Sequence, residues 1–289
     1  MKLCFDIGGT NLKYAKIENG VILERGQQKT PKVNCRETVP AEIIGLVKKF
    51  GGREISGLGI ASAGQIDCEK GRVIHATRNL PDYTGCELKQ IVETETGLPC
   101  TVENDANAAA LGEMRMGVAA NDENFVMLTL GTGIGGAFVV NRQLFRGNAG
   151  IAGEVGHIVI EKNGRPCNCG GNGCLEQYAS ISALLRDYKE VSGRELNGYK
   201  IMRLIMEKDE QAMQVFSSYI NSLAKGITTL IHFLDPGLVI IGGGFSREGK
   251  RLINPLRKRV REIAMPSISD HTRILSAELH NDAALIGVS

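Results

Sequence analysis

The stretch KLCFDIGGTNLKYAKIENGVILERGQQ, residues 2–28, predicts three strands joined by two tight turns. The first strand ends at the glycine pair 8–9, and the other two are joined by the Asn-Gly pair 19–20, which is typical of two-residue hairpins. FVMLTLGTGIGGAFVVNRQLF, residues 125–145, repeats the order of strand, glycine-rich turn and strand. The repetition predicts a chain built from two related halves.

The rest of the chain alternates between helical and strand patterns. Helices are predicted over 40–50, 86–98, 106–117, 180–193, 198–208, 210–234, 248–264 and in a short stretch from Asn281. Further strands are predicted over 55–62, 99–105, 237–245 and 273–279. The alternation indicates a duplicated α/β fold, with two similar domains flanking a cleft. We expect an N-terminal domain at 1–115, completed by a C-terminal helix at 280–289, and a C-terminal domain at 116–279.

Composition excludes several classes of protein. The 289 residues are 43% hydrophobic and 23% charged, which are ordinary globular values. A net charge of +2 gives no indication of a nucleic-acid partner. The start of the chain lacks the pattern of a signal peptide, and no apolar window is long enough to span a membrane, so we expect a cytoplasmic protein without a membrane partner. That location disfavours structural disulfides.

Glycine-rich turns are the first candidate binding elements. GTGIGG, residues 131–136, fits the dinucleotide pattern G-x-G-x-x-G, but a strand follows where that fold needs a helix. Backbone N–H groups in this turn and in DIGGTN, residues 6–11, would instead bind one polyphosphate from both sides of the cleft. Asp6 would face the phosphates and suit a water-bridged Mg²⁺. The cluster IIGGGFS, residues 240–246, would let the backbone approach a base or ribose, although any one such loop could be a simple tight hairpin.

A carboxylate lies where a strand is predicted to end and a helix to begin. ENDANAAALGE, residues 103–113, places Asp105 at that junction. Asn104 or Asp105 could serve only as the N-cap of the helix. A cap position would also hold the carboxylate at the edge of the cleft, so the two roles are compatible.

Three of the eight cysteines are clustered in GEVGHIVIEKNGRPCNCGGNGCLEQ, residues 153–177. Cys167, Cys169 and Cys174, with His157, supply the ligand count of a closed tetrahedral zinc site. A disulfide would leave one thiol unpaired, and a nucleophilic cysteine needs no such companions. Without an open position, the metal is expected to be structural. The other five cysteines (Cys4, Cys35, Cys68, Cys86 and Cys100) are interpreted as small apolar core residues.

Taken together, DIGGTN, ENDANAAALGE, LGTGIGG, AGEVGH, CNCGGNGCLE and IIGGG resemble the motifs of the ROK family, in the family's order and over essentially the whole chain. This family comprises sugar kinases and sugar-responsive repressors on the actin/hexokinase-like (ribonuclease H-like) ATPase fold. The resemblance implies ATP-dependent phosphorylation of the 6-hydroxyl of a hexose. Glucose is the first choice, and N-acetylmannosamine or another hexosamine is the alternative. The family also implies a homodimer.

The resemblance assigns roles to individual residues. Asp105 would be the general base, and the zinc ligands would be His157, Cys167, Cys169 and Cys174. The sugar would contact Asn104, Asp105, Glu154, His157 and Glu176, with Asn79 and Gly64 as further contacts. ATP and Mg²⁺ would contact Asp6, Gly8, Gly9, Thr10, Asn11, Lys13, Gly131, Thr132, Gly133, Gly135 and Gly243. Ala63 departs from the family, which usually has proline before the glycine at position 64.

Two other classes of function compete with a kinase. A sugar-sensing transcriptional regulator of this family would carry a DNA-binding domain before the first phosphate turn, and that turn begins here at residue 6. A sugar-binding protein without catalysis is disfavoured because Asp6, Asp105 and both glycine turns are present. We therefore expect an enzyme.

Overall fold

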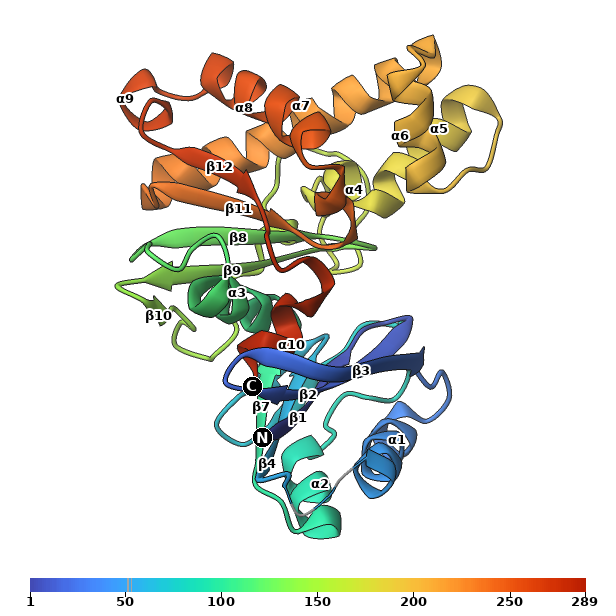
Figure 1. Cartoon of the computed structure of the whole chain (residues 1–289). Coiled ribbons are helices and arrows are strands. Elements are labelled where there is room, and N and C mark those ends of the chain that lie inside the picture. The colour runs from blue at the N-terminus through green and yellow to red at the C-terminus, as the bar shows by residue number, and fades with distance from the viewer. Residues whose placement is uncertain (51, 53) are drawn as a thin grey trace. The chain divides into compact units, whose positions relative to one another are not determined.

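The computed structural model describes residues 1–50, 52 and 54–289, which form two compact units (Figure 1). Unit 1 comprises Met1–Asn121, Leu144–Ala152 and Asn281–Ser289. Unit 2 comprises Asp122–Gln143 and Gly153–His280. The segments 116–121 and 144–152 therefore group with unit 1 and not with the predicted C-terminal domain at 116–279.

Unit 1 is built on a five-stranded sheet with the order β3-β2-β1-β4-β7. Its central strand β1 pairs antiparallel with β2 and parallel with β4. The strands are β1 (Lys2–Ile7), β2 (Asn11–Glu18), β3 (Val21–Lys29), β4 (Gly57–Ser62) and β7 (Cys100–Asn104), with a separate hairpin of β5 (Gln65–Asp67) and β6 (Arg72–His75). The helices are α1 (Cys35–Phe50), α2 (Leu88–Thr96), α3 (Asp105–Met116) and α10 (Ala283–Gly287), the last preceded by the 3₁₀ turn η3 (His280–Asp282).

Unit 2 is built on a second five-stranded sheet with the order β10-β9-β8-β11-β12. Its central strand β8 pairs antiparallel with β9 and parallel with β11. The strands are β8 (Phe125–Leu130), β9 (Ile134–Val140), β10 (Gln143–Leu144), β11 (Leu238–Gly242) and β12 (Arg273–Ser276). The helices are α4 (Glu176–Ala179), α5 (Ile181–Ser192), α6 (Gly198–Met206), α7 (Glu210–Leu234), α8 (Lys250–Ile263) and α9 (Pro266–Ser269), with 3₁₀ turns η1 (Val155–His157) and η2 (Gly244–Glu248).

The two sheets share one topology. In each, the first strand of the unit lies at the centre, and the next two strands lie on one side of it, the nearer one antiparallel to it. Two further strands, both parallel to the central strand, lie on the other side. The glycine turn between β1 and β2 therefore has its counterpart between β8 and β9. This repeated arrangement confirms the predicted duplicated α/β fold.

Each unit has its own hydrophobic core. The central strands read as nearly continuous apolar runs because helices or loops cover both faces of the sheets: β1 and β8 are buried along almost their whole lengths. The core of unit 1 includes Phe5 and Tyr83, and that of unit 2 includes Tyr188 and Tyr219, all at most 2% exposed.

Helices α3 and α10 of unit 1 pack closely through glycines. A Cβ atom on Gly112 would lie 2.1 Å from the carbonyl oxygen of Ala283, and one on Gly287 would lie 1.7 Å from that of Ala108. Only glycine permits backbones to approach this closely. The last residues of unit 1 are thereby fastened to the helix that follows β7.

Helix α1 begins at Cys35, earlier than the predicted start at residue 40. Pro40 lies inside the helix and cannot donate a backbone hydrogen bond to the carbonyl of Arg36. The thiol of Cys86 lies 3.5 Å from that carbonyl oxygen and donates to it instead. The helix therefore extends five residues before Pro40, and a thiol from a neighbouring segment compensates for the lost bond.

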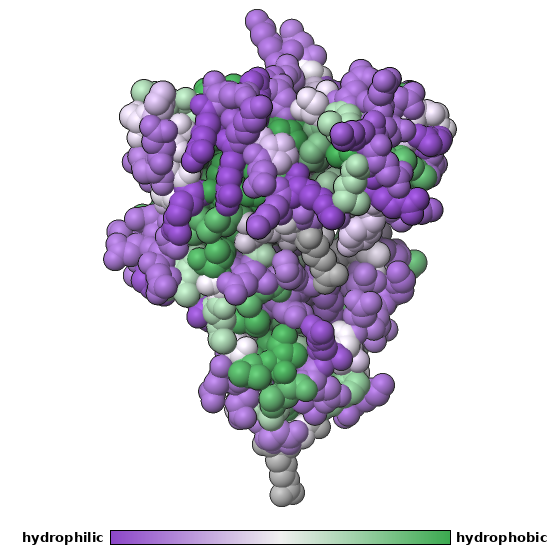
Figure 2. All heavy atoms as spheres, turned by 45° about the horizontal axis from the view of Figure 1, so that its top comes forward, coloured by the Kyte–Doolittle hydropathy of each residue, from purple (hydrophilic) through white to green (hydrophobic). Residues whose placement is uncertain are grey.

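Basic side chains are less evenly spread than the net charge suggested. Helix α8 carries Arg257, Lys258, Arg259 and Arg261 within five residues. Hydrophilic side chains predominate over the helices of unit 2 on the face shown in Figure 2. Among the described residues, no helix has the length and apolar character needed to cross a membrane.

Candidate active site and metal centre

The turn between β1 and β2 holds the predicted phosphate-binding residues of unit 1. The N–H of Gly8 donates to the carbonyl oxygen of Asn11 at 3.0 Å, which closes the turn, and Thr10 is exposed. Asp6 and Lys13 are opposite each other in the β1–β2 register, and the Lys13 ammonium lies 2.7 Å from the Asp6 carboxylate. The structure therefore brings this acid and this base together at the end of the strand that leads into the turn.

Asn79, predicted to contact sugar, lies beside the same turn. A Cβ atom on Gly9 would be 3.1 Å from the Cβ of Asn79. The ammonium group of Lys32 joins the two segments by donating to the carbonyl oxygens of Gly9 and Asn79. Lys32 had not been predicted as a site residue.

The β7–α3 junction holds the predicted general base. Asn104 is the N-cap of α3, and its side-chain oxygen accepts from the N–H groups of Ala106 and Asn107 at 2.9 and 3.1 Å. This decides between the two capping candidates in favour of Asn104. Asp105 is the first helical residue, where the helix dipole stabilises a negative charge.

The same junction collects a third predicted residue. The amide nitrogen of Asn104 donates to the carbonyl oxygen of Gly64 at 2.9 Å and to a carboxylate oxygen of Asp105 at 3.1 Å. Gly64 adopts φ +107°, where a Cβ would lie 2.7 Å from the carbonyl oxygen of His75. Gly64, Asn104 and Asp105 thus form one compact group in unit 1, whereas Asn79 is at the β1–β2 turn.

In unit 2, the turn between β8 and β9 contains Gly131, Thr132 and Gly133. The N–H of Gly131 donates to the carbonyl oxygen of Gly133 at 3.0 Å, and Thr132 is exposed. Gly135 is already within β9 and pairs with Thr129. A strand follows the turn, as predicted, so the turn is unlike the strand-to-helix turn of a dinucleotide fold.

Gly243 lies against the end of β8, next to this turn. It adopts φ +81°, and a Cβ there would lie 2.3 Å from the carbonyl oxygen of Leu130. Close packing between β8 and the segment after β11 therefore requires glycine at position 243. The close approach predicted for a base or ribose is therefore made here by the protein's own backbone.

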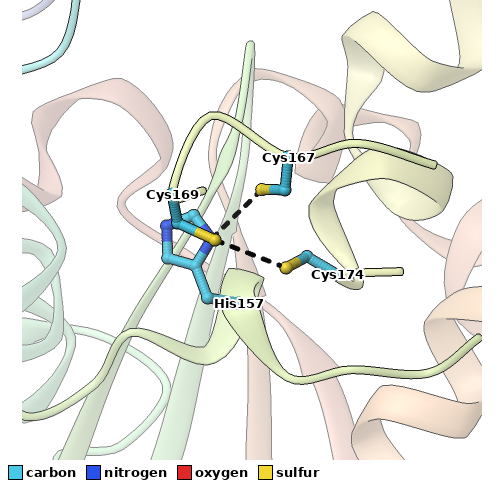
Figure 3. Close-up of side chains that lie close together, drawn as sticks. All are labelled: His157, Cys167, Cys169 and Cys174. Atoms are coloured by element: carbon cyan, nitrogen blue, oxygen red, sulfur yellow. Dashed lines mark hydrogen bonds between the residues drawn. The ribbon is translucent and has the colours of Figure 1, made fainter. Parts of the chain in front are cut away.

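The four predicted metal ligands are clustered in unit 2 (Figure 3). One ligand atom from each of His157, Cys167, Cys169 and Cys174 lies within 4.8 Å of the others. Figure 3 shows the four side chains converging from η1 and from the loop that precedes α4. Gly170 and Gly173 adopt φ +91° and +79°, which lets the chain turn tightly between the ligands.

The distances between the ligand atoms fit zinc. In a tetrahedral site with Zn–S bonds of about 2.3 Å, sulfur atoms lie about 3.8 Å apart, and sulfur and nitrogen about 3.6 Å apart. The Sγ atoms of Cys169 and Cys174 are 3.6 Å apart, and Sγ of Cys167 lies 3.5 Å from Nδ1 of His157. A disulfide would require about 2.05 Å. The geometry therefore favours a metal over the disulfide alternative.

Burial and charge also favour a cation at this cluster. Cys174 is 1% exposed, whereas Cys169 is exposed. Burial, followed by the neighbouring thiols of Cys167 and Cys169, raises the pKa of the Cys174 thiol to about 12. Three thiolates in one cluster therefore need a divalent cation to offset their repulsion.

The predicted sugar-binding acids of unit 2 are placed by this metal loop. Glu154 immediately precedes η1, and its carboxylate lies 3.8 Å from Nε2 of His157, the ring nitrogen that faces away from Cys167. At that distance the carboxylate is close to the ring nitrogen but beyond hydrogen-bond distance. Glu176 begins α4, and its Oε2 accepts from the N–H of Ile134 at 2.9 Å.

Sequence reasoning missed one buried network in unit 1. Glu103, 7% exposed, forms a 2.5 Å ion pair with Arg146 and accepts hydrogen bonds from Cys68 and Asn107. The only signal was that Glu103 directly precedes Asn104. Arg146 comes from a segment with no periodic pattern, so nothing local indicated its partner.

Comparisons with known proteins agree with the fold. The chain matches the sequence model of the ROK family over residues 2–289. It is 35% identical to a glucokinase of Thermotoga maritima, with 98% of this chain and 94% of that protein aligned. A crystal structure of a ROK family glucokinase from Streptomyces griseus, in complex with glucose and AMPPNP, is 32% identical with a TM-score of 0.88, covering 99% of this chain and 97% of that one.

A third similar protein is a putative N-acetylmannosamine kinase from Listeria monocytogenes. It is 28% identical with a TM-score of 0.88, covering 100% of this chain and 97% of that one. The duplicated sheet topology and the glycine turns define a hexokinase-like α/β protein. Within that class, the chain belongs to the ROK family.

Proposed function

We propose that this protein is an ATP-dependent hexose kinase that phosphorylates the 6-hydroxyl of its substrate, with glucose as the preferred hexose. The observation that carries the proposal is the placement of Asp105 at the N-terminus of α3, beside the capping Asn104. Support comes from the near full-length similarity to a glucokinase and from the similarity to a structure that binds glucose and AMPPNP.

Asp105 receives the proton of the attacking hydroxyl in this proposal. Its place in the first helical turn favours the ionised carboxylate, which is a weak base but is always available. A weak base suffices if the transition state is loose, because the hydroxyl then loses its proton late. Asn104 binds the sugar, with Gly64 beside it and Asn79 as a further contact.

The two glycine turns bind the phosphates of ATP. Backbone N–H groups in glycine-rich turns suit anionic oxygen atoms, and Lys13 supplies a positive charge near the first turn. Asp6 would hold Mg²⁺ through water, and the cation would neutralise the charge on the phosphates. Gly243 adjoins the second turn and is assigned to the adenosine side.

Zinc has a supporting role in the proposal. His157, Cys167, Cys169 and Cys174 would hold it, and the closed ligand set leaves no position for substrate. The bound metal would fix the loop at residues 153–177. Glu154 and Glu176 would then present acceptors to the sugar hydroxyls, since each carboxylate accepts more than one hydrogen bond, and the second ring nitrogen of His157 would donate to a sugar oxygen.

N-acetylmannosamine is the alternative substrate, because a putative kinase for it has the same fold over the whole chain. Initial rates with ATP and a panel that includes glucose and N-acetylmannosamine would decide, with ³¹P NMR to locate the phosphate on the product. Fastest turnover of glucose with a 6-phosphate product is expected. No turnover of any hexose would refute the kinase and favour the regulator. A homodimer and a cytoplasmic location remain predictions.

A further inference from the structure

Glu103 directly precedes Asn104 and Asp105 in the sequence, and its buried side chain contacts Asn104 in the structure. Its Oε1 accepts three hydrogen bonds, from the N–H of Asn104 at 3.0 Å, from the side-chain amide of Asn107 at 3.1 Å and from the thiol of Cys68 at 3.0 Å. Its Oε2 receives Nη2 of Arg146 at 2.5 Å. One buried carboxylate thus joins the end of β7, the first turn of α3, the β5–β6 hairpin and the segment 144–152.

The hydrogen bonds to Oε1 hold the backbone at the β7–α3 junction. The N–H of Asn104 and the side chain of Asn107 lie on either side of Asp105 in the sequence, so both flanks of the base are attached to one acceptor. Burial, followed by the hydrogen bond to Glu103, raises the pKa of the Cys68 thiol to about 12. Cys68 is therefore a neutral donor at neutral pH and adds no charge to the network.

Arg146 supplies the charge that balances Glu103. A buried carboxylate is costly unless it is paired and hydrogen-bonded. Among the described residues, Arg146 is the cation paired with Glu103, and its contact with Oε2 leaves Oε1 to accept the other three hydrogen bonds. Its own Nε is buried without a hydrogen-bond partner in the described structure, which reduces the net stabilisation that the arginine provides.

We propose that Arg146 is a positioning residue for the phosphoryl transfer, acting through Glu103 to hold Asn104 and Asp105 in their reactive directions. The inference rests on the proposed function, since it concerns the base and the sugar ligand of that reaction. Arg146 does not touch substrate in this account. Its guanidinium orients the carboxylate, and the carboxylate orients the junction.

The test uses Arg146→Met in the full-length, metal-loaded enzyme. Displacement of a catalytic group by about 1 Å costs roughly a hundredfold in rate, so kcat/KM for glucose is expected to fall tenfold to hundredfold. The KM for ATP is expected to stay within about twofold of the parent, because the contacts of both glycine turns are unaltered. Millimolar guanidinium added to the variant is expected to restore part of the lost kcat.

The matched control is Arg72→Met, which breaks a surface ion pair to Glu87 in the same unit. It is expected to leave all kinetic constants and the guanidinium response unchanged. Arg146→Lys retains the charge but loses the planar fork, and its kcat/KM should lie between those of the parent and Arg146→Met. If Arg146→Met does not fold, Arg146→Lys and Cys68→Ala carry the test.

Hydrogen exchange of the peptide spanning residues 104–107 separates this inference from the proposed function. Faster exchange in the Arg146 variants than in Arg72→Met would support the positioning role even if the parent phosphorylated no hexose. A folded Arg146→Met with kcat/KM within about threefold of an active parent would overturn it. Unchanged exchange, or a lower melting temperature as the sole effect, would also overturn it.

Discussion

Glu176 accepts a hydrogen bond from the backbone N–H of Ile134 at 2.9 Å, which connects the start of α4 to the β8–β9 turn. Gly133 makes room for this contact, because a Cβ there would lie 2.2 Å from Oε2 of Glu176. In the proposed function, Glu176 binds sugar and the turn binds phosphate. The hydrogen bond therefore couples the groups for the two substrates within unit 2.

Gly133→Ala is expected to displace Glu176 and weaken sugar binding. Loss of one hydrogen bond to a charged acceptor corresponds to about tenfold in the Kd of glucose, measured by calorimetry without nucleotide. Gly131→Ala is the matched control, since a Cβ at Gly131 meets nothing within 4 Å. Equal glucose affinity in the two variants would contradict the coupling.

Asp105→Asn is expected to lower kcat by about 10³-fold or more while glucose still binds. The substitution keeps the side-chain oxygen that accepts from Ala106 at 2.9 Å and the amide of Asn104 at 3.1 Å, so the junction should survive. Steady-state rates and calorimetry would separate the two effects. Turnover within about tenfold of the parent would refute the role of general base.

Cys169→Ser, or removal of the metal by chelation, is expected to loosen residues 153–177. Loss of supporting contacts around a metal lowers metal affinity or activity by about tenfold to a hundredfold. We expect a change of this size in the Kd of glucose and no change in the Kd of an ATP analogue. Cys35→Ser, far from the cluster in the sequence, should keep the metal content of the parent. Unchanged glucose affinity in a verified metal-free sample would exclude the scaffold role.

His271 provides a pH-dependent interaction with Asp235, at 2.6 Å between Nε2 and Oδ1. The hydrogen bond to Asp235 raises the pKa of His271 above its ordinary value. The pair therefore stabilises the fold fully below the unfolded pKa of about 6.5, and this contribution is lost as pH rises through the raised value. Asp235→Asn should lower the pKa of His271 in an NMR titration, and an unaltered value would contradict the assignment.

Local patterns predicted the elements with the clearest signals. Helix α7 spans the predicted residues 210–234 because Asp209 caps its start and its apolar positions repeat with the helical period. The zinc ligands were also predictable, since three of them lie within eight residues of one another. In both cases, the deciding information is contained in a short stretch.

Features that depend on distant residues were not predictable in this way. Glu103 and Arg146 are 43 positions apart, and their pairing follows from the path of the segment 144–152 through unit 1. The β5–β6 hairpin escaped prediction because its strands have only three and four residues, too few for a period to be recognised. The start of α1 was missed because the Cys86 thiol compensates for Pro40 from another segment.

The grouping of Asn281–Ser289 with unit 1 has a consequence for synthesis on the ribosome. A nascent polypeptide contains every residue of unit 2 before it contains the segment that covers Gly59 and Gly112. Unit 1, whose synthesis begins first, is thus the last unit to complete its fold, in contrast to the usual order of cotranslational folding. Until residues 281–289 have been synthesised, the surfaces of β4 and α3 around Gly59 and Gly112 stay uncovered.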